Sequence, residues 1–288
     1  MELTFYHNGE LLRSTELHIS AFDQAFLYGE GITEPILVRN RKLLLAEKHF
    51  DRFFRGASTI GLDLRVTEKI IEKTIMTLLD LNSMNDCMVR LIATKGDSSG
   101  YFYEDVHSLP TFLMMTLPLK FFSEKLYYMG VTLKTSSWRD ISPTSFYHDI
   151  RTLSAMNRRV NYREAKEEGN FDSLMINIEG YVTQCTGSNI FLVKERTLIT
   201  PDLSCGIFPG VTREYVLYDV ARELNLDTYE GFILQHNVIN AEECFITSTE
   251  AGVLPVAACD GEKIGTGRPG RITKMIQEYF TSWYKSTM

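Results

Sequence analysis

GIFPGVTR, at residues 206–213, is the stretch from which the fold can be built outward. Gly210 closes a turn, and the spacing of residues 212–224 predicts that a helix follows it. A glycine-led turn that opens a helix leaves backbone N–H groups free, and the helix dipole adds to their attraction for an anion. The same residues also suit an ordinary loop in which Thr212 caps the helix. The two interpretations do not exclude one another.

Strand-like and helical segments lie on both sides of this turn. Upstream, the pattern predicts a strand at residues 130–134, a helix over 151–169 that closes at Glu168-Gly169, and strands at 173–178 and 189–193. Glu179-Gly180 is the expected turn between the last two strands. Downstream, we predict a strand at 244–247 and a terminal helix over 272–283.

The first part of the chain alternates the same two patterns. A strand at residues 3–7 ends in the turn signal Asn8-Gly9, and a hairpin is expected from residues 36–39 and 42–46 around Asn40-Arg41. Helices are predicted over 47–56 and 67–81, and strands over 87–94 and 111–116. We therefore expect an α+β protein with a smaller N-terminal domain (1–117), a connection (118–122) and a larger C-terminal domain (123–288).

Composition excludes several classes of protein. A formal net charge of −7 argues against a nucleic-acid partner, because phosphate binding favours a basic surface. No apolar run approaches the ~20 residues that cross a bilayer, and the N-terminus lacks a signal-peptide pattern, so we expect a cytoplasmic protein. The five cysteines and six histidines are scattered, which predicts reduced buried thiols and no metal site.

Several motifs occur in a fixed order along nearly the whole chain. They are NGE at 8–10, DQAFLYGEGITE at 23–34, HFDR at 49–52, GIFPGVTR at 206–213, FITSTEA at 245–251 and GTGRPG at 265–270. Together they resemble the class IV aminotransferases, the fold-type IV pyridoxal phosphate (PLP) enzymes. This family includes branched-chain and D-amino-acid aminotransferases and aminodeoxychorismate lyase. The resemblance implies the two-domain D-amino-acid aminotransferase-like fold, bound PLP or pyridoxamine phosphate, and small amino-acid and 2-oxo-acid substrates. It also implies a homodimer with the active site between the two domains.

The resemblance also implies roles for individual residues. Arg52 would grip the cofactor phosphate, which suits a guanidinium fork that is always charged; alone, it would read as a surface arginine in a loose ion pair. Val211 and Thr212 would belong to the phosphate cup. Thr249 would be a further phosphate ligand, but the two residues before it, Thr247 and Ser248, also carry hydroxyls, so any of the three could contact the anion. Thr33 replaces an aromatic residue that often lines the substrate pocket.

The central segment departs from the family pattern at its most important position. DIRTLS at 149–154, followed by Glu164-Ala165, matches the family's segment without a gap and places Arg151 where the family has its Schiff-base lysine. That lysine forms the covalent link to PLP and later carries a proton. Arginine, with a pKa above ~12, can do neither near neutral pH. Lys134 and Lys166 lie elsewhere, and we keep open that one of them substitutes for the missing lysine.

A second departure concerns the cofactor ring. Gln184 stands where the family has a glutamate that pairs with the protonated pyridine nitrogen. An amide can donate or accept a hydrogen bond but cannot hold a full counter-charge, so we expect weaker ring protonation. Both departures weigh against catalysis.

Three hypotheses follow from these residues. The first is a PLP-dependent transaminase of branched-chain or related amino acids. The second is a pseudoenzyme that binds PLP, pyridoxamine phosphate or another anionic small molecule noncovalently, with Arg151 as a charged contact. The third is a lyase of the aminodeoxychorismate lyase type, which meets the same objection because that reaction also uses the lysine.

Overall fold

A computed structural model describes residues 2–103, 109–119 and 122–286. The chain divides into two compact units. The first runs to Lys120 and includes the later segment Ile150–Ser154. The second comprises the described residues of Phe121–Asp149 and Ala155–Thr287. Both contain helices and sheet, as predicted for an α+β protein.

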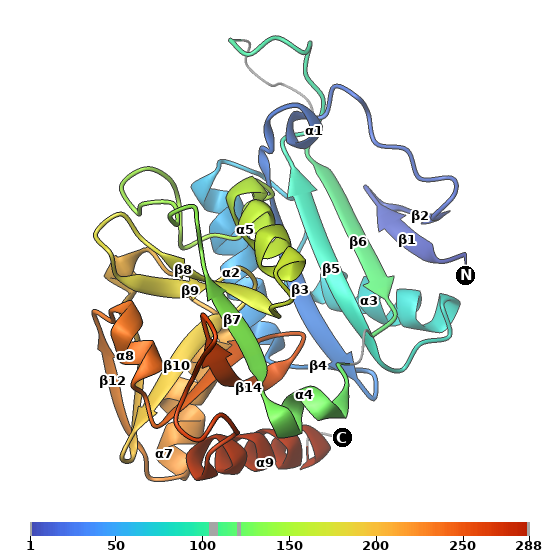
Figure 1. Cartoon of the computed structure of the whole chain (residues 1–288). Coiled ribbons are helices and arrows are strands. Elements are labelled where there is room, and N and C mark those ends of the chain that lie inside the picture. The colour runs from blue at the N-terminus through green and yellow to red at the C-terminus, as the bar shows by residue number, and fades with distance from the viewer. Residues whose placement is uncertain (1, 104–108, 120–121, 287–288) are drawn as a thin grey trace. The chain divides into compact units, whose positions relative to one another are not determined.

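The first unit is built on a six-stranded antiparallel sheet (Figure 1). Its strands, in sheet order, are β2 (Glu10–Arg13), β1 (Thr4–His7), β6 (Thr111–Leu117), β5 (Cys87–Thr94), β3 (Gly31–Arg39) and β4 (Lys42–Leu43). Asn8 and Gly9 have φ of 47° and 101°, and Asn40 and Arg41 have φ of 45° and 64°. Two-residue hairpins favour this left-handed pair of residues. Both predicted hairpin turns are confirmed.

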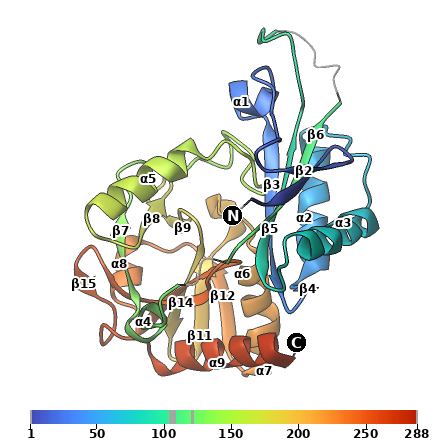
Figure 2. The ribbon, with the colours of Figure 1, turned by 90° about the vertical axis from the view of Figure 1, so that its right-hand side faces the viewer.

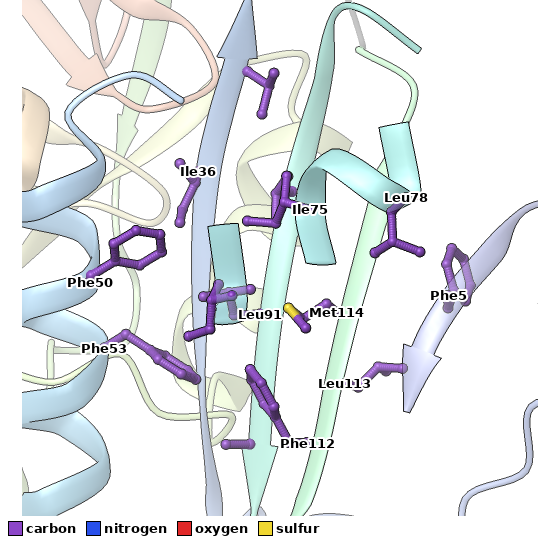
Figure 3. Close-up of a cluster of buried hydrophobic side chains, with 14 of the residues drawn as sticks. Phe5, Ile36, Phe50, Phe53, Ile75, Leu78, Leu91, Phe112, Leu113 and Met114 are labelled. Atoms are coloured by element: carbon purple, nitrogen blue, oxygen red, sulfur yellow. The ribbon is translucent and has the colours of Figure 1, made fainter. Parts of the chain in front are cut away.

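Two helices cover one face of this sheet. They are α2 (Ala46–Thr59) and α3 (Glu68–Leu81), and Figure 2 shows both on the same side of it. Phe50 of α2 lies beside Ile36 of β3, and Phe53 of α2 and Leu78 of α3 belong to the same buried cluster as Leu91 of β5 and Phe112 and Met114 of β6 (Figure 3). Each such side chain stabilises the fold by roughly 1.5–3 kcal/mol on burial. This packing fixes α2 against β3, the two elements that carry the candidate site of the unit. A short helix, α1 (Gln24–Tyr28), precedes β3.

The predicted helix over residues 151–169 begins later than expected. The helix α5 spans Met156–Glu167, whereas residues 150–154 are not helical and meet β3 through an isolated bridge between Thr152 and Ile32. The carbonyl of Arg151 accepts a hydrogen bond from the Thr33 N–H (2.9 Å), and the Leu153 N–H donates to the Gly31 carbonyl (2.9 Å). These bonds use the backbone groups that a helix would need. The prediction that Arg151 lies in a helix is therefore wrong.

The second unit contains a nine-stranded mixed sheet. Its order is β12 (Asp227–Gly231), β11 (Thr197–Pro201), β10 (Asn189–Lys194), β13 (Glu243–Ser248), β14 (Gly252–Cys259), β7 (Val131–Thr135), β8 (Asp172–Ile176) and β9 (Val182–Cys185), with β15 (Glu262–Lys263) paired to β14. Its remaining helical elements are α4 (Glu124–Met129), η1 (Leu203–Cys205), α6 (Val211–Glu214), η2 (Tyr215–Val220), α7 (Ala221–Glu223), α8 (Gln235–Ile239) and α9 (Arg271–Ser286). The last, α9, packs against β13 and β14. Apart from the start of α5, the predicted strands and helices of this half are confirmed to within a few residues.

Two further expectations can be compared with the structure. All five cysteines are buried free thiols, as predicted. Within the residues described, no helix is both long and apolar enough to span a membrane.

Candidate functional site

Three ionisable side chains form a buried network in the first unit. Glu34 on β3 accepts two hydrogen bonds from the Arg52 guanidinium, Nε to Oε2 at 2.9 Å and Nη2 to Oε1 at 2.6 Å. His49 Nδ1 lies 2.6 Å from the same Oε1. Because a carboxylate can only accept, the neutral His49 ring donates from Nδ1. His49 and Arg52 are three residues apart on α2 and therefore share one helix face.

Burial and charge act against each other in this network. Burial alone raises the pKa of the Glu34 carboxyl, but the charge of Arg52 and the hydrogen bonds from His49 and Arg52 outweigh it and hold that pKa below its ordinary value. Burial lowers the pKa of His49, and the charges of Arg52 and Arg151 lower it further against the opposing effect of Glu34. The unit thus holds one ionised carboxylate beside two permanent cations.

Arg151 lies close to this network because its backbone is hydrogen-bonded to β3. Its carbonyl bonds to the Thr33 N–H at the start of β3, and its charge acts on the buried His49 ring. The Thr33 hydroxyl donates to the Leu91 carbonyl at 3.0 Å, so it is tied to the neighbouring strand β5. Three of the predicted site residues, Thr33, Arg52 and Arg151, therefore belong to one region of the first unit.

In the second unit, side chains of β9 and β10 hold the turn that precedes α6. The Phe208 N–H donates to Gln184 Oε1 (3.0 Å), and Asn189 Nδ2 donates to the Phe208 carbonyl (2.8 Å). Gly210 then caps a helix that runs without a break through α6, η2 and α7. A Cβ on Gly210 would overlap Asn189 Oδ1. This close approach is what requires a glycine there.

The predicted phosphate ligands of the second unit lie on elements that pack together. Val211 and Thr212 begin α6, which contacts β13, and Ser248 ends β13 just before Thr249. The Ser248 hydroxyl accepts a hydrogen bond from the Ala251 N–H at 3.1 Å. The Thr247 hydroxyl is buried and has no hydrogen-bond partner among the described residues. Buried hydroxyls are normally hydrogen-bonded, so this one has room for a partner from outside the described part of the chain.

Gln184 has a second contact that the sequence did not indicate. Its Nε2 donates to Oδ2 of Asp140 at 3.1 Å, and the Thr183 hydroxyl donates to the same oxygen at 2.7 Å. Asp140 follows β7 in the chain, 44 residues before Gln184. The sequence also gave no role to Glu34 or His49, although both stand within the quoted motifs. A buried carboxylate needs charged or hydrogen-bonding neighbours, and this signal appears only once the fold brings them together.

Comparison with known proteins agrees with this geometry. A model of the family described as Amino-transferase class IV matches residues 31–259. The chain belongs to the class IV aminotransferases. It is 27% identical over 285 residues to a putative branched-chain-amino-acid aminotransferase of Methanocaldococcus jannaschii, an alignment that covers 98% of both chains. It is 30% identical over 273 residues to a D-alanine aminotransferase of Bacillus licheniformis, covering 94% of this chain and 93% of the relative.

The fold agrees with solved class IV structures. The branched-chain amino acid aminotransferase of Escherichia coli superposes with a TM-score of 0.94 at 21% identity, covering 99% of this chain and 95% of that one. The branched-chain amino acid aminotransferase of Thermobaculum terrenum, solved in its PLP-form, superposes with a TM-score of 0.88 at 22% identity, covering 99% of this chain and 94% of that one. The fold is therefore the fold-type IV architecture.

Class IV aminotransferases bind PLP, and the residues of this chain fit a phosphate group in each unit. The first unit offers the guanidinium of Arg52. The second offers the helix that begins at Val211 and, beside Ser248 and Thr249, the Thr247 hydroxyl, which has no partner in the part of the chain that the structure describes. The predicted roles of Arg52, Val211, Thr212, Ser248, Thr249 and Thr33 stay predictions, as does the correspondence of Arg151 and Gln184 with the family's lysine and glutamate.

Proposed function

We propose that this class IV aminotransferase homologue binds a phosphorylated form of vitamin B6, PLP or pyridoxamine phosphate, without a covalent bond. The observation that carries the proposal is Arg151, which stands at the expected lysine position in a chain that keeps the family fold. A guanidinium stays protonated in proteins, so it neither attacks an aldehyde nor removes a proton near neutral pH.

The candidate phosphate ligands support binding of the anion. Arg52 is a permanent cation that is only 4% exposed, and its position is fixed by Glu34. The net charge of Glu34, Arg52 and Arg151 together is positive, which favours an anionic ligand. In the second unit, the first turn of α6 presents backbone N–H groups.

The two lysines considered as replacements are poorly suited to the covalent role. Lys134 forms an ion pair with Glu168 (3.1 Å), and the hydrogen bond and charge of Glu168 raise the pKa of Lys134. It therefore stays protonated, whereas a nucleophile must be neutral. Lys166 Nζ lies 5.7 Å from the centre of the Phe171 ring, a cation–π contact that places its amine against that ring.

A bound B6 ring would supply an electron sink and an amino-group carrier. The chain's residues bind and orient it, but Arg151 holds no proton that can move at neutral pH. The substrates of the family are amino acids and 2-oxo acids. We expect this chain to transfer no amino group between them.

Calorimetric titration with pyridoxamine phosphate tests this proposal, with unphosphorylated pyridoxamine as the matched ligand. We expect saturable binding of the phosphate ester alone, and loss of that binding in Arg52→Ala. Undiminished affinity in Arg52→Ala would contradict the assigned anchor. Transamination of leucine, glutamate or D-alanine well above a no-enzyme control would overturn the proposal in favour of an active transaminase.

We further propose that the chain forms a homodimer, as the family resemblance implies. An exposed aromatic cluster in the first unit supports it. Tyr28 and Phe102 make an edge contact with ring centres 5.4 Å apart, Phe102 and Tyr103 another at 5.3 Å, and Tyr103 is 97% exposed. Exposed apolar patches of this kind mark interaction surfaces. Sedimentation analysis of Phe102→Lys is expected to give a monomer, and an unchanged dimer would exclude this surface.

The buried free thiols also suit a reducing compartment. We therefore infer a cytoplasmic location.

A further inference from the structure

The two partners of Gln184 leave its side-chain amide one orientation. A backbone N–H can only donate, so the atom that faces the Phe208 N–H at 3.0 Å must be the amide oxygen. The other end of the amide faces Oδ2 of Asp140 at 3.1 Å, and its nitrogen Nε2 donates to that carboxyl oxygen. Each partner gives the same assignment independently of the other.

Asp140 is itself firmly held. Its Oδ2 also accepts from the Thr183 hydroxyl (2.7 Å), its Oδ1 accepts from the Ile141 N–H (2.9 Å), and its own N–H donates to the Ile176 carbonyl of β8 (2.8 Å). Gln184 is 6% exposed and Asp140 7% exposed, so water screens the carboxylate only weakly. The contact is therefore a rigid part of the second unit.

The charge of Asp140 has a partner on a different element. Burial lowers the pKa of Arg158 on α5, and the negative charge of Asp140 opposes that shift. The groups recorded around Asp140 are thus Arg158 from α5, Thr183 and Gln184 from β9, and backbone groups of β8 and its own loop. The charged neighbours of Gln184 thus include Asp140 and, beyond it, Arg158, while the Gln184 amide itself carries no charge.

We propose that Asp140 is a positioning residue that locks Gln184 with its amide nitrogen as a donor, so that a ligand ring nitrogen at this residue is held unprotonated. The amide nitrogen carries two hydrogens, and Asp140 takes one. The other meets a ring nitrogen that accepts a hydrogen bond. This inference rests on the proposed function, because the ring belongs to the proposed B6 ligand.

The same geometry makes a glutamate at position 184 incompatible with Asp140. The Gln184→Glu side chain would bring a second carboxylate oxygen to the position now occupied by Nε2, about 3 Å from Asp140. Two buried carboxylates at that separation share one proton and do not both ionise. Gln184 and Asp140 therefore form a matched pair, and a full negative charge at 184 requires a change at Asp140 as well.

Thermal unfolding of the ligand-free protein from pH 5 to pH 8 tests the pair without any cofactor. The variants are Gln184→Glu, Asp140→Asn and the double variant. In Gln184→Glu the two carboxyl groups share one proton, so the folded-state pKa of the pair lies above the unfolded glutamate value near 4.3. The free energy of unfolding therefore decreases as the pH rises. We expect its Tm, relative to wild type, to fall by about 4–8 °C between pH 5 and pH 8.

The control variants make this result specific. Asp140→Asn alone and the double variant are expected to follow the wild-type pH profile, because neither holds two facing carboxylates. A Gln184→Glu profile parallel to wild type would show that Asp140 is not coupled to position 184 and would overturn the inference. If Gln184→Glu fails to fold at pH 8, recovery of folding in the double variant supports the same pair.

A second readout addresses the ring nitrogen itself. Pyridoxamine phosphate labelled with 15N in the ring is titrated into each protein, and the ring-nitrogen chemical shift is measured by NMR. We expect the unprotonated shift in wild type at pH 7 and the protonated shift in the double variant. A protonated ring in wild type would overturn the inference while leaving the proposed binding intact. Absence of binding would overturn both the proposed function and the ligand part of this inference, and the unfolding data would still test the coupling of Asp140 to Gln184.

Discussion

Replacement of Glu34 by glutamine probes the buried network of the first unit. The change keeps the size of the side chain and one hydrogen-bond acceptor, but it removes the negative charge that faces Arg52. Arg52 is 4% exposed and Glu34 1% exposed, so water cannot replace the lost carboxylate. The guanidinium would be left in a poorly solvated position without the two charge-assisted bonds that now hold it.

The expected magnitude follows from these contacts. Removing one partner of a buried ion pair costs about 3–5 kcal/mol. The amide oxygen of the substituted side chain can still accept one hydrogen bond, so we expect the low end, about 3 kcal/mol. For a chain of this size, that corresponds to a fall in Tm of roughly 6–12 °C.

Urea unfolding of wild type, Glu34→Gln, Arg52→Met and the double variant gives the four free energies of a mutant cycle. The double variant no longer contains the buried cation, so it should recover most of the loss seen in Glu34→Gln. A loss below about 1 kcal/mol in Glu34→Gln would refute the reasoning. So would a double variant whose loss equals the sum of the single losses, because the two side chains would then be uncoupled.

Three further changes test other parts of the account. The folded-state pKa values of both Glu34 and His49 are lowered. Folding stability should therefore fall as the pH drops below the unfolded His49 pKa near 6.5, and fall further below the unfolded Glu34 pKa of about 4.5. In unfolding measured at several pH values, His49→Gln should lack the first of these losses, and a stability–pH curve parallel to that of wild type would contradict the prediction. Gly210→Ala should displace Asn189 and lower the free energy of unfolding by about 1–3 kcal/mol. Calorimetry should also show weaker binding of pyridoxamine phosphate, and an affinity equal to that of wild type would show that this turn does not bind the anion. Arg213→Met removes a guanidinium that is 1% exposed, is ion-paired with Glu230 and donates to the Pro201 carbonyl. The free energy of unfolding in urea is expected to fall by about 3–5 kcal/mol. A change of less than about 0.5 kcal/mol, the size typical of a surface substitution, would contradict this prediction.

The sequence was most informative where local rules determine structure. The turns at Asn8-Gly9 and Asn40-Arg41 need two left-handed residues; Asn8, Gly9 and Asn40 are types that favour this conformation, and Arg41 adopts it as the second residue of its turn. The helix α3 has apolar residues at helical spacing and a threonine cap, and it spans Glu68–Leu81 as the pattern indicates. A prediction was wrong where contacts with residues distant in the sequence determine the local structure. The residues around Arg151 have a helical pattern, but the backbone of Arg151 forms a hydrogen bond with β3 instead.

The contacts of the site were also beyond sequence reasoning. Arg52 and Gln184 could be singled out by their motifs, but not the carboxylates that hold them. Glu34 and Arg52 are 18 residues apart, and Asp140 and Gln184 are 44 apart on different elements. The two residues of each pair lie on different elements, so the periodicity within one helix or strand does not indicate their contact. Such pairs become visible only when tertiary packing places them side by side.

Borohydride reduction in the presence of PLP is the most direct test of the central claim. The protein is saturated with PLP, reduced, digested, and searched for pyridoxyl-lysine by mass spectrometry, with Arg151→Lys as the matched control. We predict saturable binding without a labelled lysine in wild type, and a label at residue 151 in the variant. A single stoichiometrically labelled lysine in the wild-type chain would contradict the account, because it would show that another amine has taken over the covalent role.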